Sequence, residues 1–234
     1  MALVVGVTGS IATGKSSLCQ YLVERHGAVH ADGDRVVHRM YDPGRPGFDR
    51  IVEEFGPTVV GADGMIDRRV LGSMVFGNAE RMKALTTAIG DIKAEMKGII
   101  DEWRATLAPD AIAILELVLL IDERYSRWCD QTWLVAVEDD IALPRLMARN
   151  GLTEAEALQR LASARPWQER APAADHIFMN AGAREEMERE VDVVIANTLE
   201  EHRAGTLGES QYAVWQRETD AAAASTAPGT APSA

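Results

Sequence analysis

Short apolar runs alternate along the chain with longer segments whose apolar residues recur at helical spacing. The first run, Ala2–Val7, is rich in valine and has the length of a buried strand, and a helical pattern follows it from Ser17 to Gly27. Further strands are predicted at 28–31, in the first half of 111–121, at 132–137 and within 174–182. This alternation is typical of an α/β fold in which helices flank a parallel sheet.

Between the second and third predicted strands the pattern is almost wholly helical. Helices are predicted at 36–40 and 48–55, separated by a turn rich in proline and glycine, and residues 80–107 form one or two more. We therefore expect a helical insertion at about 44–108 in a domain that covers residues 1–212. Residues 213–234 become rich in alanine, serine, threonine and proline and are expected to be largely disordered.

A second helical segment, at about 140–172, carries a concentration of arginines. Thr153 and Glu156 have the spacing of a capping box and predict the start of a helix there. The arginines of this segment are Arg145, Arg149, Arg160, Arg165 and Arg170. As a group they suggest a lid that closes on phosphates, although any one of them could instead belong to a solvated helix face with acidic neighbours.

The turn after the first strand carries the most specific motif in the chain. Residues 9–16, Gly-Ser-Ile-Ala-Thr-Gly-Lys-Ser, fit the phosphate-binding pattern G-x-x-x-x-G-K-[ST] between a strand and a helix. The backbone amides of such a loop cradle phosphates, Lys15 can reach the β- and γ-phosphates, and the Ser16 hydroxyl can ligate Mg²⁺. The predicted nucleotide contacts are Gly9, Ile11, Ala12, Thr13, Gly14, Lys15, Ser16 and Ser17.

The charge and composition of the chain narrow the choice of partners. A formal net charge of -12 argues against a general nucleic-acid surface, because binding to a phosphate backbone needs a positive field. The sequence contains no apolar run long enough to span a membrane, and a cytoplasmic location is expected. Cys19 and Cys129 are expected to be reduced, packed thiols, neither a disulfide framework nor a metal cluster.

Two carboxylates follow the second predicted strand, in Asp32-Gly33-Asp34. Ligands bind at the carboxyl ends of the strands in parallel α/β sheets, so these side chains are expected beside the phosphate-binding loop. Asp32 and Asp34 are candidates for contact with a metal-bound water or for orienting an attacking hydroxyl. A solvated turn is the competing interpretation.

An ordered set of motifs resembles the dephospho-CoA kinase family over about residues 3–200. The set comprises residues 5–17, Asp32-Gly33-Asp34, 42–44, 55–56, 63–69 with Leu71 and Phe76, Leu119-Leu120, 145–153, and Ala174-Asp175 with Asn180 and Gly182. The resemblance implies a P-loop core with a helical substrate-binding insertion and a helical lid. It also implies transfer of the γ-phosphate of ATP to the ribose 3′-hydroxyl of dephospho-CoA with Mg²⁺, giving coenzyme A and ADP.

The resemblance implies roles for individual residues. Asp34 matches the carboxylate that receives or orients the attacking hydroxyl, Lys15 is the second catalytic residue, and Arg149 matches the lid position that closes on ATP. The acceptor is expected to meet Asp32, and the cations that offset its pyrophosphate are Arg68, Arg69 and Arg81.

The chain departs from the family pattern mainly on the acceptor side. The family's Leu-His-Pro falls on Ile89-Gly90-Asp91, its Pro-Leu-Leu on Val118-Leu119-Leu120, and family residues differ at His38, Arg165 and Arg170. A kinase of another small hydroxylated acceptor and a catalytically weak, CoA-binding regulatory paralogue are the alternatives. A GTPase switch is disfavoured because the sequence has no Asn-Lys-x-Asp guanine signature.

Overall fold

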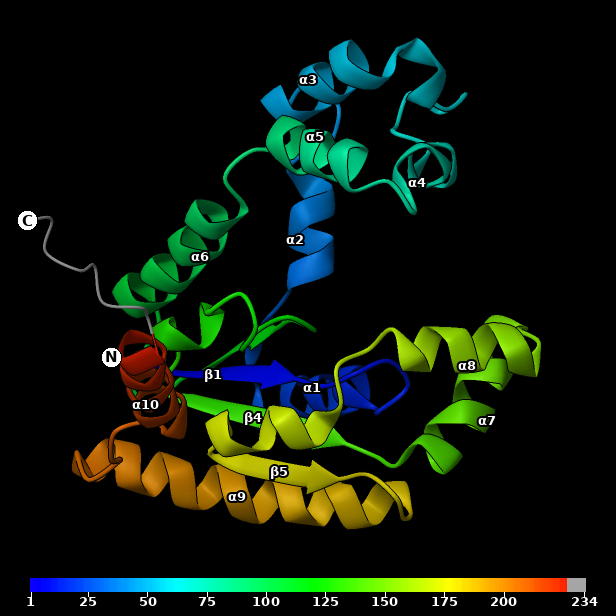
Figure 1. Cartoon of the computed structure of the whole chain (residues 1–234). Helices are drawn as coiled ribbons and strands as arrows, with labels where there is room; N and C mark the ends of the chain where they lie inside the picture. Colours follow the sequence, from blue (N-terminus) through cyan, green and yellow to red (C-terminus); the bar gives the residue numbers. More distant parts are fainter. Residues whose placement is uncertain (227–234) are drawn as a thin grey trace, which may run out of the picture. The chain divides into compact units, whose positions relative to one another are not determined.

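The computed structural model describes residues 1–226 and divides into two compact units (Figure 1). Unit 1 comprises Met1–His30 and the described residues from Trp103 onward, and unit 2 comprises Ala31–Glu102. The second unit is thus inserted into the first along the chain. Each unit has its own hydrophobic core.

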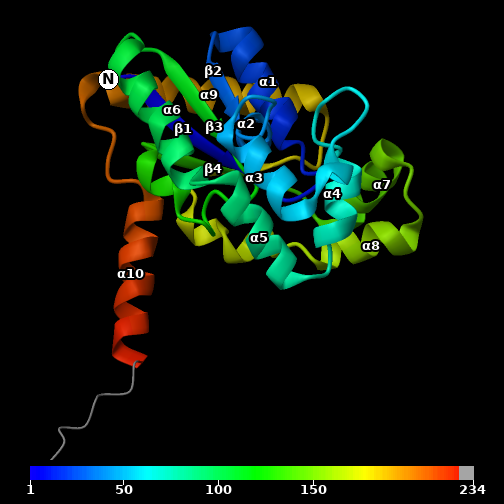
Figure 2. The same cartoon turned by 90° about the horizontal axis from the view of Figure 1, so that it is seen from above.

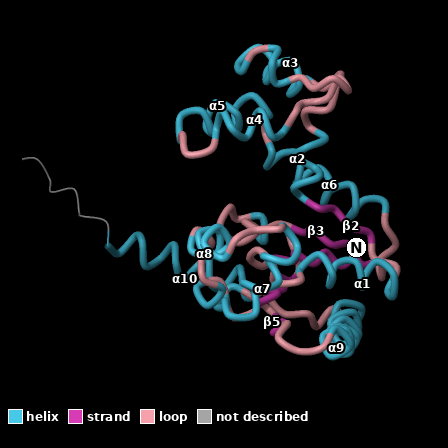
Figure 3. The backbone as a smooth tube through the Cα atoms, turned by 90° about the vertical axis from the view of Figure 1, so that its right-hand side faces the viewer, coloured by secondary structure: helices cyan, strands magenta, loops and turns pink. Residues whose placement is uncertain are grey.

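A five-stranded sheet with the order β2-β3-β1-β4-β5 forms the centre of the described part of unit 1, and Figure 3 shows its strands side by side. Its strands are β1 (Leu3–Thr8), β2 (Val29–Asp32), β3 (Ile112–Glu116), β4 (Gln131–Ala136) and β5 (His176–Met179). The pairs β1–β3, β1–β4 and β4–β5 are parallel, with Val5 opposite both Ile114 and Gln131. Every residue of β1 is buried, which explains why this strand is a continuous apolar run.

Two helices cover one face of the sheet. Helix α1 (Lys15–His26) contributes Leu18 and Leu22 to the main core, and helix α9 (Arg184–Ala204) contributes Val191 and Ile195. They pack on the inward side chains of the central strands, among them Trp133. The two helices are also joined by the hydroxyl of Tyr21, which donates to Asp192 of α9 at 2.9 Å.

The opposite face is closed partly by the segment that follows β3. A Cβ atom added to Gly6 in β1 would lie 2.6 Å from a methyl of Leu120 and 2.9 Å from the sulfur of Cys129. Glycine at position 6 therefore allows this segment to lie directly on the central strand. Helix α10 (Gln211–Thr226) starts in the same region, where Tyr212 packs with Ile121 and Ala173.

Helix α10 differs from the sequence-based expectation of disorder from residue 213 onward. Tyr212, in its first turn, is fully buried, and α10 leads away from the sheet in Figure 2. Alanine-rich composition is compatible with a helix once one end is anchored. The remainder of the predicted tail, 227–234, lies outside the described residues.

The segment between β4 and β5 folds as helices α7 (Asp139–Asn150) and α8 (Glu154–Ala162), followed by the 3₁₀ turns η3 (Trp167–Glu169) and η4 (Ala171–Ala173). The predicted capping box is confirmed, because Thr153 accepts from the amide of Glu156 and the Glu156 side chain accepts from the amide of Thr153. Leu146 and Leu161 join the two helices in a small separate core.

Unit 2 is helical, apart from the end of β2 and an isolated bridge between Val60 and Ile66. Its helices are α2 (Gly33–Arg39), α3 (Pro46–Phe55), α4 (Arg68–Val75) and α5 (Ala79–Ile89), and α6 (Ile92–Thr106) leads back to unit 1. Ile51 and Val59 are fully buried in its core. Within residues 1–226, none of the helices combines the length and the apolar character that a membrane span requires.

Candidate active site

The loop between β1 and α1 has the backbone conformation that its glycines were expected to provide. Gly14 has a φ of 91°, in the left-handed region, and precedes the first residue of α1, Lys15. A Cβ atom on Gly9 would lie 2.5 Å from the carbonyl oxygen of Val135, so a side chain cannot be accommodated there. The loop therefore leads directly into a helix N-terminus, where backbone amides favour anions.

Asn180, directly after β5, supports this loop from outside. Its Nδ2 donates to the carbonyl oxygen of Thr13 at 2.8 Å, and its own carbonyl oxygen accepts from Nη1 of Arg145 at 2.8 Å. A Cβ atom on Gly14 would come within 2.1 Å of the same Nδ2, so Gly14 also makes room for the asparagine. Arg145 thus contributes to the shape of the phosphate-binding loop, a different role from contact with phosphates at a lid.

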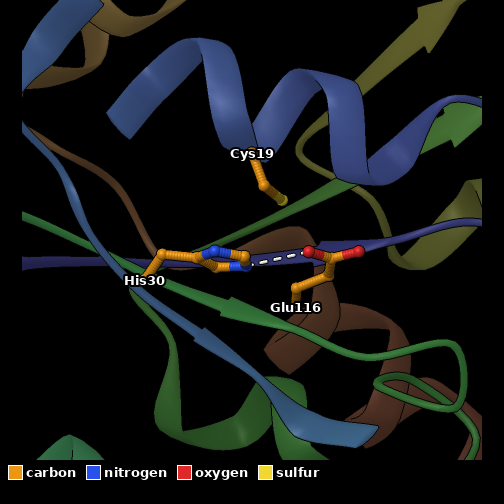
Figure 4. A group of neighbouring side chains, drawn as sticks. All are labelled: Cys19, His30 and Glu116. Atoms are coloured by element: carbon orange, nitrogen blue, oxygen red, sulfur yellow. Dashed lines mark hydrogen bonds and ion pairs between the residues drawn. The ribbon is translucent and has the colours of Figure 1, made fainter. Parts of the chain in front are cut away.

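A buried carboxylate, Glu116, lies beneath the end of the loop (Figure 4). It is the last residue of β3, and its side chain is 3% exposed. Lys15 forms an ion pair with Oε1, the Ser16 hydroxyl donates to the same oxygen at 2.6 Å, and Nε2 of His30 lies 2.8 Å from Oε2. The two oxygens of Glu116 therefore face different groups, the P-loop on one side and His30 on the other.

The partners of Glu116 decide its protonation state. Burial alone would raise its pKa, but the hydrogen bonds from His30, Lys15 and Ser16 together hold the pKa of Glu116 well below its usual range. The carboxylate is ionised at neutral pH, and Nε2 of His30 must carry the proton to donate to it. Glu116 was missed as a site residue in the sequence. The available signal was its position as the one charged residue in a strongly apolar run.

Two of the predicted lid arginines are bound to a single carboxylate. Nε of Arg170 donates to Oδ2 of Asp122 at 2.9 Å, and Nη1 of Arg165 donates to Oδ1 at 2.8 Å. Arg170 is also 3.3 Å from the hydroxyl of Ser10 in the P-loop, and its side chain is only 3% exposed. Because it is buried and paired, Arg170 anchors the segment after α8 to the loop.

Arg149 differs from these residues. It lies in the last turn of α7, is exposed, and its Nε donates to the side chain of the adjacent Asn150 at 3.0 Å. Arg160 is likewise exposed, on α8. The contacts therefore separate the five arginines: Arg145, Arg165 and Arg170 bind groups beside the loop, although Arg165 is 42% exposed, whereas Arg149 and Arg160 are exposed on their helices.

A cavity of about 250 Å³ lies beside the outer edge of the P-loop. It is lined by Ser10, Ile11, Thr13, Val137–Asp139, Ala142, Leu161, Ala162 and Ala164–Gln168. The cavity lies between the loop, the first turn of α7 and the segment after α8. Its volume is below the roughly 300–1,000 Å³ that ligand sites commonly have, so it forms no complete nucleotide site by itself.

The candidate carboxylates of unit 2 occupy the start of α2. Asp32 is its N-cap, and Oδ1 accepts from the amides of Asp34 and Arg35 at 3.0 and 3.2 Å. Asp34 lies in the first turn with an exposed side chain. Asp32 thus caps the N-terminus of α2, whereas the exposed carboxylate of Asp34 can contact a substrate.

Of the three acceptor-side arginines, Arg68 and Arg69 are brought together and Arg81 is separate. The first two line a surface hollow that also contains Asp63 and Asp67. Nη1 of Arg68 lies 2.9 Å from Nδ1 of His38, whose pKa is lowered by burial and then by this neighbouring guanidinium. Arg81 instead lies over the ring of Phe55, at 5.2 Å from its centroid, with Glu54 at 3.9 Å.

Comparison with known proteins decides the family. The model of the dephospho-CoA kinase family matches residues 3–186. The chain belongs to the dephospho-CoA kinase family. A dephospho-CoA kinase of Symbiobacterium thermophilum is 37% identical over 190 residues, 81% of this chain and 78% of the relative. One from Streptomyces avermitilis is 35% identical over 209 residues, 89% and 99% of the two chains.

Solved structures agree with the P-loop kinase fold of the family. A crystal structure from Thermus thermophilus covers 84% of this chain and 97% of its own, with a TM-score of 0.68 and 29% identity. A dephospho-CoA kinase from Campylobacter jejuni covers 83% and 96%, with a TM-score of 0.56 and 23% identity. The sequence-based assignments of fold class and family are confirmed.

The altered dipeptide of this family member forms a helix junction. Gly90 ends α5 with a φ of 112°, and Oδ1 of Asp91 accepts from the amide of Ala94 at 2.9 Å at the start of α6. A glycine and a capping aspartate are a physically sound way to end one helix and begin the next. The departure from the family's His-Pro is therefore structurally self-consistent.

Proposed function

We propose that this protein transfers the γ-phosphate of ATP to the ribose 3′-hydroxyl of dephospho-CoA, giving coenzyme A and ADP. The observation that carries the proposal is the P-loop whose Lys15 and Ser16 are both held by the ionised Glu116, in a chain of the dephospho-CoA kinase family. Phosphoryl transfer depends mainly on positioning and on neutralising charge, which are the properties that this arrangement supplies.

Lys15 is proposed to change partners when ATP binds. Its ammonium pairs with Glu116 in the structure, and in this proposal it turns to the β- and γ-phosphates of bound ATP. The pairing holds the Lys15 side chain beside the loop, so less side-chain freedom remains to be lost on binding. The loop amides, from Gly9 to Ser17, contribute the remaining contacts to the phosphates in this proposal.

Mg²⁺ fits the residues beside Lys15. The Ser16 hydroxyl and the Glu116 carboxylate lie 2.6 Å apart, and both are the hard oxygen donors that Mg²⁺ prefers. When bound, the ion would neutralise charge on the β- and γ-phosphate oxygens. We propose Ser16 as a direct ligand and Glu116 as a partner of the ion or of its water.

The acceptor is proposed to be oriented by unit 2. Asp34, with its exposed carboxylate, receives or orients the 3′-hydroxyl, while Asp32 fixes the helix turn that carries Asp34 and borders the acceptor. Arg68 and Arg69 offset the acceptor's pyrophosphate, and Arg81, which lies apart from them over Phe55, is proposed as a further cation for the acceptor. Arg149 closes on the nucleotide.

A cytoplasmic location is proposed because an ATP-dependent enzyme with two buried reduced thiols suits a reducing compartment.

The test is a direct product assay. Purified protein is incubated with ATP, Mg²⁺ and dephospho-CoA, and coenzyme A is detected by mass, with Lys15→Ala as the control that should lose most of the activity. Nucleosides and simple sugars form the acceptor panel. Phosphorylated nucleosides or sugars without coenzyme A would identify a different kinase, and dephospho-CoA binding without any product would identify a regulatory paralogue.

A further inference from the structure

The side chains of three residues bring a sulfur, a nitrogen and an oxygen together beneath helix α1 (Figure 4). They belong to Cys19 on α1, His30 on β2 and Glu116 at the end of β3, and their ligand atoms all lie within 4.8 Å of one another. Within residues 1–226 they form the one such group of histidine, cysteine and carboxylate side chains. All three residues belong to unit 1.

We propose that Cys19, His30 and Glu116 form a binding site for a thiophilic divalent cation of the Zn²⁺ type. Thiolate, imidazole and carboxylate are the three ligand classes that Zn²⁺ uses, and three protein ligands leave a fourth position for water. Around a tetrahedral Zn²⁺ such atoms stand about 3.3–3.6 Å apart, given metal–ligand distances of about 2.0–2.3 Å. The observed atoms, all within 4.8 Å of one another, are already close to this spacing.

The geometry of Glu116 separates this site from the one proposed for Mg²⁺. Lys15 and Ser16 use Oε1, whereas His30 faces Oε2. A cation held by Oε2 replaces the hydrogen bond from His30. The proton of the neutral His30 ring then resides on Nδ1, and Cys19 releases its thiol proton to the solvent. Sulfur also provides selectivity, because Mg²⁺ prefers oxygen ligands and Zn²⁺ accepts thiolate.

The exposed side of the group gives the ion a route of entry. The His30 side chain is 22% exposed, whereas Glu116 is 3% exposed and Cys19 is buried. An ion can therefore meet the imidazole first and reach the thiol by rotation of the ring. The thiol of Cys19 lies against the hydrophobic core of the sheet, which keeps water away from the inner side of the bound ion.

The shared carboxylate couples the two cation sites. A cation bound at Oε2 neutralises part of the negative charge of Glu116, so the carboxylate attracts Lys15 and an ion at Ser16 less strongly. The bound cation also repels these two positive charges across the carboxylate. Occupancy by Zn²⁺ should therefore lower the affinity for Mg²⁺-nucleotide. By thermodynamic reciprocity, Mg²⁺-nucleotide should lower the affinity for the thiophilic cation by the same factor.

Cobalt titration tests the site directly, without any enzyme assay. The full chain, reduced with a phosphine and free of chelator, is titrated with Co²⁺, which reports thiolate ligation by a charge-transfer absorption band in the near ultraviolet. We expect the band in the wild type and in Cys129→Ala, the matched buried-cysteine control, and its loss in Cys19→Ala. His30→Gln should weaken Co²⁺ binding by at least roughly 10- to 100-fold, the loss that even outer-shell changes cause.

The outcomes separate this proposal from the kinase activity. A wild-type protein without the band, or a band that persists in Cys19→Ala or disappears only in Cys129→Ala, overturns the site even if coenzyme A is produced. His30→Gln replaces a partly exposed side chain and provides a second test should Cys19→Ala fold poorly. Unchanged Co²⁺ affinity in His30→Gln also overturns the three-ligand site. The coupling is checked by repeating the wild-type titration with saturating Mg²⁺-ADP, where weaker Co²⁺ binding is expected.

Discussion

At the residue scale, the ionised Glu116 links the chemistry of the P-loop to the stability of the fold. An unfolded glutamate takes up a proton near pH 4.3, whereas the pKa of Glu116 in the folded protein lies well below its usual range. The stabilisation from Glu116 is thus fully present above about pH 5 and is lost as the pH falls from there toward the folded pKa.

Glu116→Gln should flatten this acid dependence. Between about pH 5 and 3, the free energy of unfolding of the variant should fall less steeply than that of the wild type, by up to about 1.4 kcal/mol per pH unit, because one proton uptake has been removed. Urea denaturation at several pH values measures the slopes. Glu200→Gln, an exposed position on α9, is the control and should keep the wild-type slope. Equal slopes in Glu116→Gln would contradict the pKa direction.

Substitutions of Asp34 and Asp32 should distinguish a catalytic carboxylate from one that caps a helix. Asp34→Asn should lower kcat by about 10²- to 10⁴-fold, the range for a positioned base, with little change in the KM for ATP. Its stability should stay within about 0.5 kcal/mol, because the side chain is exposed. Steady-state kinetics and urea denaturation measure both quantities.

The matched variant is Asp32→Asn, whose remaining side-chain oxygen can still accept from the amides of Asp34 and Arg35. It should reduce turnover less than Asp34→Asn does. The opposite order of the two effects would assign the catalytic role to Asp32 and leave Asp34 as an exposed helix residue.

At the scale of elements, α7 presents one exposed arginine that can act on a ligand. Arg149→Ala should raise the KM for ATP and lower kcat, with a loss of at least about tenfold in kcat/KM, because a charge-assisted hydrogen bond is worth about 1.5–3 kcal/mol. Arg189→Ala, on the exposed side of α9, is the control. Unchanged kinetics in Arg149→Ala would show that Arg149 is a solvent-exposed helix residue that does not contact the nucleotide.

Helix α10 depends on one buried aromatic side chain. Tyr212 is fully buried, and in the described residues its hydroxyl has no hydrogen-bond partner. Tyr212→Ala should cost about 3–5 kcal/mol of unfolding free energy, because a large side chain is removed from the core. Tyr212→Phe should leave stability unchanged or raise it by up to about 1 kcal/mol, since the unpaired hydroxyl is removed. Urea denaturation compares the two, and equal losses would contradict the packing described.

The elements were predictable to different degrees from the sequence. The strand pattern, the P-loop and the Thr153 capping box depend on neighbouring residues, and the predicted positions agree with the structure to within a few residues. Helix α10 was not foreseen, because its anchor Tyr212 becomes informative only when Ile121 and Ala173 are known to surround it. Local composition carries no information about such a contact.

At the scale of the whole molecule, the contacts of the candidate site that escaped prediction are long-range. Glu116 meets Ser16 across 100 residues and His30 across 86, and Asn180 meets Thr13 across 167. The spacing of residues along the sequence does not reveal such pairs unless a known motif already links the two positions. The convergence of Cys19 with His30 and Glu116 was likewise hidden, because a count of two cysteines predicts only packed thiols.

The order of the strands has a consequence for synthesis of the chain. Strand β1 leaves the ribosome before the other four strands of its sheet, yet its two neighbours are β3, at residues 112–116, and β4, at residues 131–136. At roughly 5–20 residues per second, the most buried strand waits about 5–20 seconds for its first partner. During that interval its valines are exposed to water and to other nascent chains, and the helices of unit 2 are completed before the strand can pair. The nascent enzyme should therefore depend on chaperones that hold apolar segments close to the ribosome.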